Sequence, residues 1–326
     1  MKGIFLALLL VSAFNLAAKD YSIGTKESFW QFDPIKGADS MEAGYYQADF
    51  TCRKIGEHTI MFVEDKLKPK DEPSPEFIDK LCNRFDAIYP VFSDYFGQPT
   101  DLDHNGKFII LTAAIRDWFY YSMEVTADMK PILGYYWLPF NQRMQVDYLT
   151  MASVQPEIDA YGTMAHEFTH NIYDNANPEP VNFIDRAITE SLAQYAIYLN
   201  GTLDQDSYFQ WELSILKKDL VNGKMLNAFD GTHDYFDIGN SDTHHCYAVS
   251  YYFLHYVADY LLASREMKME FFETLINEKV NDTSMNKMTN ALIKMGLIKD
   301  AAGFNDFYFK NFKDFLFKYF NIAKGQ

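Results

Sequence analysis

The pattern of hydrophobic and polar residues in the first half of the chain is typical of strands. Alternating and β-branched segments predict strands at residues 46–50, 58–63, 107–112, 133–138 and 144–151. A helix is predicted between Ser74, a helix N-cap residue followed by proline, and Gly97. The N-terminal half is therefore expected to be rich in β-structure.

The second half shows a helical periodicity, because hydrophobic residues recur there at spacings of three and four. Helices are predicted at residues 182–199, 204–221, 246–262, 267–280, 284–295 and 305–322. Lysine and aspartate interrupt the aromatic residues of the last helix, which favours docking onto the other helices over binding to a membrane surface. The predicted fold class is α+β: a mixed β-rich N-terminal lobe at residues 19–174, a mainly α-helical C-terminal lobe at residues 175–326, and an active-site cleft between them.

The N-terminus has the layout of a secretory signal peptide. Lys2 is followed by an apolar run over residues 3–16 and by Ala17 and Ala18, which predicts a signal peptide at residues 1–18. Leu16, at the third position before the predicted cleavage point, leaves an uncleaved membrane anchor as the alternative. The mature protein is expected to be extracytoplasmic: secreted, periplasmic or at the cell surface.

Composition and charge narrow the classes of partner. The chain has 326 residues, 48% of them hydrophobic, which excludes a disordered protein. The net charge of −16 repels phosphate backbones and anionic lipids, so we expect no nucleic-acid partner and no membrane contact beyond the signal segment. The three cysteines allow one disulfide, with Cys52 and Cys82 as the first pair to consider, or three buried thiols that include Cys246.

Residues 166–170 form the motif H-E-x-x-H, the strongest candidate for a catalytic site in the sequence. On a helix His166 and His170 lie on one face and can ligate one ion, while Glu167 can act as the general base of a zinc hydrolase. The opposite side of this helix carries an apolar stripe made of Tyr161, Met164, Ala165, Phe168 and Ile172. The alternative is a core helix whose histidines are satisfied by hydrogen bonds.

A third ligand is needed, because catalytic zinc sites generally use three protein ligands and a water. Residues 175–180 contain two prolines and are expected to break the helix, so that the next helix runs back along it. Glu190 lies on this returning helix, 20 residues after His170. The return brings a carboxylate to the two histidines and predicts a His166, His170, Glu190 zinc site.

With these motifs the chain resembles the gluzincin metallopeptidases, and within them the hyicolysin-like secreted bacterial peptidases. The resemblance rests on residues 161–170 and 188–193, the turn and strand at 101–111, and residues 245–251. It departs from the family at Glu190, which is flanked by threonine and serine where Asn-Glu-Gly is frequent.

The resemblance implies two further site residues. Tyr247 would stabilise the oxyanion that forms on the scissile carbonyl, with His244 or His245 as alternative donors and a packed helix tyrosine as the structural alternative. Gln194, one turn after Glu190, would accept a hydrogen bond from a ligand histidine, where several relatives have a carboxylate.

A second pattern concerns calcium. Asp101, Asp103 and Asn105 place oxygen atoms at alternating positions before Gly106, as calcium-binding loops do. The twelfth position of such a loop is Thr112 where a bidentate glutamate is expected, so a plain turn into a strand is favoured over Ca²⁺ binding.

Together these features predict a secreted zinc-dependent metallopeptidase acting on peptides or proteins. One of the two strands predicted before the H-E-x-x-H helix, at residues 133–138 and 144–151, is expected to be an edge strand beside the cleft, where it could bind an extended peptide. The aminopeptidase-like members of the family that the chain resembles are exopeptidases and have a Gly-rich strand that recognises the substrate amine. Residues 144–154 show no such strand, so the resemblance favours an endopeptidase. The competing hypotheses are a secreted binding protein or adhesin with a vestigial or structural zinc site, and a metallohydrolase of non-peptide amides or esters.

Overall fold

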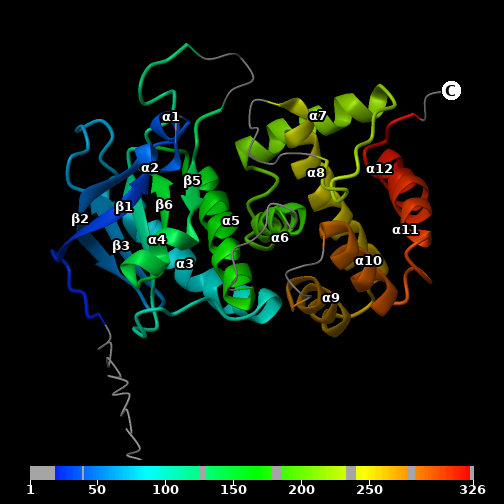
Figure 1. The fold of residues 1–326 in the computed structure, drawn as a ribbon, viewed down its shortest axis with the longest axis horizontal. Helices are drawn as coiled ribbons and strands as arrows, with labels where there is room; N and C mark the ends of the chain where they lie inside the picture. The colour runs from blue at the N-terminus through cyan, green and yellow to red at the C-terminus, as the bar shows by residue number, and fades with distance from the viewer. Residues whose placement is uncertain are drawn as a thin grey trace, which may run out of the picture.

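The structure is a computed structural model that describes residues 19–38, 40–124, 130–177, 186–232, 240–277 and 283–323. It combines an N-terminal part built on a β-sheet with a C-terminal part made of helices, and helix α5 lies between them (Figure 1). The predicted mixed fold class is therefore confirmed. The predicted signal peptide at residues 1–18 lies outside the described residues.

Within the described residues one mixed sheet has the strand order β1-β2-β3-β4-β6-β5. Its strands are β1 (Lys26–Phe32), β2 (Tyr45–Ile55), β3 (Thr59–Glu64), β4 (Phe108–Ala113), β5 (Gly134–Tyr136) and β6 (Tyr148–Ala152). Strands β3, β4 and β6 are parallel, whereas β1 and β2 at one side and β5 at the other pair antiparallel. Strand β5 is thus an edge of the sheet, as expected for one of the two strands before the H-E-x-x-H helix.

Both faces of the central strands β3, β4 and β6 are buried, and their side chains alternate between two hydrophobic clusters. On β3, Met61 and Val63 pack on the side of the long helices, while Ile60 and Phe62 face the opposite cluster. The cluster on the side of the long helices continues through the helical part, so a single hydrophobic core joins the two parts of the chain.

The helices of the N-terminal part are α1 (Pro34–Gly37), α2 (Met41–Gly44), α3 (Pro75–Phe96), α4 (Leu138–Met144) and α5 (Glu157–Ala176). Helix α3 begins as predicted, because Ser74 Oγ accepts a hydrogen bond from Phe77 N at 3.1 Å, and it ends where Gly97 adopts a φ of 103°. Strand β1 and the short helices α1, α2 and α4 were not predicted. Helix α4 includes Leu138 and Met144, which were expected to belong to the strands at residues 133–138 and 144–151.

The helical part follows the predicted pattern. Its elements are α6 (Arg186–Leu199), α7 (Ser207–Val221), α8 (Ser241–His255), the π-helical turn η2 (Tyr256–Leu261), α9 (Arg265–Asn277), α10 (Ser284–Lys294), α11 (Gly303–Asp306), the π-helical turn η3 (Phe307–Phe312) and α12 (Lys313–Tyr319). Phe312 and Leu316 are fully buried, so the aromatic C-terminal segment docks onto the other helices as expected. None of the described helices is both long and apolar enough to cross a bilayer.

The suggested disulfide between Cys52 and Cys82 is not present, because all three cysteines are free and buried. Cys52 belongs to the cluster on one face of the sheet and Cys82, on α3, to the cluster on the other face. The sheet therefore separates the two thiols.

Candidate active site

Helix α5 presents one side to the core and the other to a pocket. Met164, Ala165 and Phe168 are fully buried, and the ring of Phe168 packs 4.7 Å from that of Phe85. The histidines on the opposite side are partly exposed, with 16% of the His166 side chain and 18% of the His170 side chain accessible to solvent. The predicted amphipathic arrangement of this helix is confirmed.

Helix α6 brings Glu190 to the two histidines. Glu190 Oε2 lies 3.2 Å from His166 Nε2 and 3.6 Å from His170 Nε2. One ligand atom from each of the three residues can be chosen so that all lie within 4.8 Å of one another. The spatial convergence expected from the sequence is therefore present. Arg186, one turn before Glu190, places its Nε 3.3 Å from the other carboxylate oxygen.

The charges of this cluster suit a cation. Burial by itself would raise the pKa of Glu190. The neighbouring His170, His166 and Arg186 outweigh burial and lower this pKa below its ordinary value. Burial lowers the pKa of His170 to about 4, so this imidazole is neutral at pH 7 and can act as a ligand. Burial also acts to lower the pKa of His166, but Glu190 and Glu167 raise it to about 8, so His166 would release a proton on binding a metal ion. Glu190 Oε2 is buried and has no hydrogen-bond partner among the described residues. A buried carboxylate oxygen that faces two imidazole nitrogens is the donor set that Zn²⁺ prefers.

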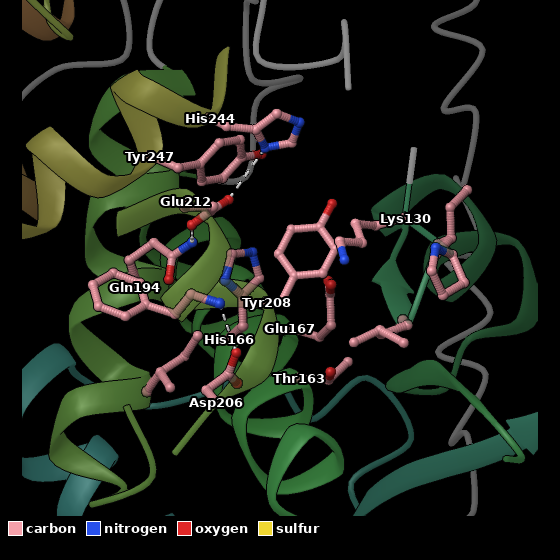
Figure 2. A pocket seen from close by; sticks show the side chains of 16 residues that line it. Lys130, Thr163, His166, Glu167, Gln194, Asp206, Tyr208, Glu212, His244 and Tyr247 are labelled. Atoms are coloured by element: carbon pink, nitrogen blue, oxygen red, sulfur yellow. Dashed lines mark hydrogen bonds and ion pairs between the residues drawn. The ribbon is translucent and has the colours of Figure 1, made fainter. Parts of the chain in front are cut away.

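Glu167 points into a pocket next to this cluster (Figure 2). Its side chain is nearly buried, and burial, together with the negative charge of Glu190 and against the influence of His166, raises its pKa to about 7. Gly134 of the edge strand lies close to it, since a Cβ at this position would be 2.4 Å from Thr163 Cγ2 and 3.4 Å from Glu167 Cγ. The glycine thus lets β5 approach Glu167 closely.

The pocket has a volume of about 180 Å³ and lies between the edge-strand segment and helices α5 to α8. It is lined by Lys130, Pro131, Ile132, Leu133, Gly134, Thr163, His166, Glu167, Gln194, Ile197, Asp206, Tyr208, Phe209, Glu212, His244 and Tyr247. Figure 2 shows Lys130 and Glu167 on one side and Gln194, Glu212, His244 and Tyr247 on the other. A cleft between the two parts of the chain, as predicted, is therefore present.

Of the three candidates for oxyanion stabilisation, the structure places two in the pocket and one outside it. Tyr247 lines the pocket, and its ring centroid lies 6.5 Å from that of His166. His244 also lines the pocket, with Nδ1 3.5 Å from Glu212 Oε1. His245 points elsewhere, because its Nδ1 lies 2.8 Å from Asp219 and its Nε2 accepts the N–H of Leu226. Tyr247 and His244 remain candidates, whereas His245 is outside the pocket.

Gln194 lies in the pocket wall, but its contacts differ from those expected. Its Nε2 donates a hydrogen bond to Glu212 Oε2 at 3.0 Å. Its Oε1 is buried and accepts no hydrogen bond from the described residues, so the expected bond from a ligand histidine is not formed. The amide is held by Glu212, a residue that the sequence analysis did not identify.

The oxygen-rich turn before β4 is held by its own hydrogen bonds. Asp101 Oδ1 accepts the N–H of Gly106, and Asn105 Oδ1 accepts that of Lys107 at 2.7 Å. Asn105 Nδ2 donates to Asp103 Oδ2 at 2.8 Å. These contacts agree with the plain turn that the sequence favours, and Ca²⁺ binding stays the less favoured alternative.

Two acidic residues that line the pocket, Asp206 and Glu212, were not predicted from the sequence. Burial raises the pKa of Asp206 to about 6 and that of Glu212 to about 7, the latter against the opposing influence of His244. Both belong to α7 or its N-cap, and a polar residue on one of many amphipathic helices carries no local signal of function. The Asp206 N-cap position before Ser207 was the one feature that could have drawn notice.

Comparison with known proteins gives one informative similarity. The chain is 25% identical over 256 residues to the neutral metalloprotease ShpI of Staphylococcus hyicus, a match that covers 73% of this chain and 52% of that protein. The chain thus spans about half the length of this curated relative. No family model matches the chain.

Proposed function

We propose that this protein is a secreted zinc-dependent metallopeptidase that cleaves internal peptide bonds. The observation that carries the proposal is the convergence of His166, His170 and Glu190 beside a pocket into which Glu167 points. The distant similarity to a neutral metalloprotease supports the same reaction class. Secretion rests on the predicted signal peptide at residues 1–18.

His166, His170 and Glu190 would hold the zinc ion, and the buried Glu190 oxygen without a hydrogen bond fits this role. Bound zinc supplies Lewis acidity, which makes water a better nucleophile near neutral pH and polarises a carbonyl oxygen. Arg186 balances the negative charge of Glu190 from the side away from the histidines.

Glu167 would carry the proton transfers. Its carboxylate accepts a proton from the water that attacks the carbonyl carbon of the scissile bond, and the same carboxyl group then gives the proton to the leaving amine. A pKa raised to about 7 by burial suits a group that both accepts and returns a proton. The Tyr247 hydroxyl or the His244 imidazole, across the pocket, would donate a hydrogen bond to the developing oxyanion.

The substrate would lie along β5. This strand is the edge of the sheet next to α5, and its outer backbone groups can pair with an extended peptide. Such pairing needs no particular substrate side chain and no free terminus. It is therefore consistent with endopeptidase action.

The test uses the full mature chain and its Glu167→Gln variant. The wild type should bind one zinc ion per chain and digest an unfolded protein, and chelation should abolish the digestion. Glu167→Gln should retain zinc and lose at least about 100-fold in rate, the range that general-base catalysis contributes. A variant that digests the substrate like the wild type would contradict the proposal.

The two alternatives predict other outcomes of the same measurements. Stoichiometric zinc without cleavage of any unfolded protein or peptide would favour a binding protein with a structural zinc site. Chelator-sensitive hydrolysis of small esters without peptide cleavage would favour a metallohydrolase of another substrate class.

A further inference from the structure

The pocket beside Glu167 contains more buried acceptor groups than the proposed proton transfers use. Asp206 and Glu212 both line its helical wall and are only 3% and 1% exposed. They add two carboxylates to that of Glu167, whereas Lys130 is the single lysine or arginine of the described lining. Buried carboxylates without an equal number of cations are costly, so a cationic ligand would stabilise this wall.

Gln194 provides a second and independent observation. It is 4% exposed, and its Nε2 donates to Glu212 Oε2 at 3.0 Å, which orients the amide and leaves Oε1 as an acceptor. This oxygen is buried and has no hydrogen-bond partner among the described residues. A buried acceptor without a partner destabilises the empty pocket, and a donor on a bound ligand would remove this cost.

The remaining walls suit a long aliphatic stem. Ile197 and Phe209 also line the pocket, and a volume of about 180 Å³ admits a long side chain. Lys130, which also lines the pocket, places its Nζ 5.5 Å from the centroid of the Trp211 ring. Figure 2 shows Lys130 reaching from the edge-strand side toward the helical wall.

On the basis of the proposed peptidase function, we infer that this pocket is a specificity subsite for a lysine or arginine side chain next to the scissile bond. Glu212 and Gln194 Oε1 receive the cationic head, Asp206 adds a second negative charge to the same wall, and the apolar walls pack against the stem. An acidic substrate side chain would meet like charges, and an apolar one would leave the acceptors desolvated and unpaired. The net charge of −16 also attracts cationic peptides.

A substitution of Asp206 tests the subsite more specifically than one of Glu212. Glu212 also contacts His244, which the proposed mechanism uses, whereas Asp206 Oδ1 accepts the N–H of Phe209 as the N-cap of α7. Asparagine is an equally good N-cap residue, so Asp206→Asn removes the charge and keeps the cap. Asp219→Asn is the matched control, because Asp219 lies on the same helix and outside the pocket lining.

The experiment compares fluorogenic peptides that differ only in the residue on either side of the scissile bond: lysine, its uncharged analogue norleucine, or glutamate. For the wild type we expect kcat/KM for lysine over norleucine to be at least about tenfold on one side of the bond. Asp206→Asn should lower this ratio several-fold, and Asp219→Asn should leave it unchanged. Equal or reversed preference in the wild type, or an unchanged ratio in Asp206→Asn, would overturn the inference.

A binding measurement separates this inference from the proposed function. Fluorescence anisotropy with the Glu167→Gln protein should show tighter binding of the lysine peptide than of the norleucine peptide, and Asp206→Asn added to that background should remove the difference. If no peptide is cleaved but this difference is present, the proposed reaction fails and the subsite stands. If peptides are cleaved without any preference for a cation, the subsite fails and the reaction stands.

Discussion

Replacing Phe168 by alanine tests whether the aromatic cluster behind α5 holds the helix of the proposed zinc site. The ring is fully buried, and its centroid lies 4.7 Å from that of Phe85, 5.2 Å from that of Phe108 and 5.6 Å from that of Tyr89. Burial of a phenylalanine side chain contributes about 1.5–3 kcal/mol, and the cavity left in a rigid aromatic cluster adds to the loss. We therefore expect the free energy of unfolding to fall by about 4 kcal/mol.

The assay is urea unfolding followed by far-UV circular dichroism at a fixed zinc concentration. Phe168→Ala should shift the midpoint without changing the slope, and Phe168→Leu, which keeps most of the volume, should shift it less. Phe309→Ala is the control, because Phe309 is 38% exposed and its loss should change stability by no more than about 0.5 kcal/mol.

Zinc content provides the second readout. Phe168 lies on the core side of α5 and the two histidines lie on its pocket side, so the folded Phe168→Ala variant should still bind one zinc ion per chain. A loss of stability below about 1 kcal/mol would refute the packing argument. Loss of zinc from a variant that stays as stable as the wild type would refute the separation of the two sides of the helix.

Three further predictions concern the ligand set, the edge strand and the helical part. Glu190→Gln should lower zinc affinity at least about tenfold, measured by competition with a chromogenic chelator, because a neutral amide replaces the charged ligand. Gly134→Ala should have a larger effect on kcat/KM than on the free energy of unfolding. The added Cβ would lie 2.4 Å from Thr163 Cγ2 and would push β5 away from α5. Burial raises the pKa of Asp259, but the hydrogen bonds that it accepts outweigh this and lower it. Asp259 therefore stabilises the fold at pH values above 3.8, so the difference in urea midpoint between wild type and Asp259→Asn should be full at pH 7, decline as the pH falls below 3.8 and vanish below the lowered pKa of the folded state.

The sequence by itself determined those features that depend on local geometry. The spacing of His166 and His170 places both on one side of any helix, and the apolar stripe decides which side faces the core. The break at residues 175–180 made the return of Glu190 predictable, because a short connection between two helices leaves them adjacent and antiparallel. The strands before α5 were recognisable in the same way, although a strand at residues 26–32 and the short helix α4 were missed.

Only the tertiary structure decided which distant side chains meet. Glu212 and His244 are 32 residues apart in the sequence, and their contact depends on how α7 packs against α8. His244 lines the pocket and His245 does not, because successive side chains on a helix point in directions about 100° apart. Which of the two faces the pocket depends on how α8 is rotated about its axis. Cys52 and Cys82 were likewise separated by the sheet. The periodicity of side chains shows which face of a helix or strand is buried, but it does not show which other element covers that face. The acidic wall of the pocket depends on which elements pack against each other, so only the tertiary structure could show it.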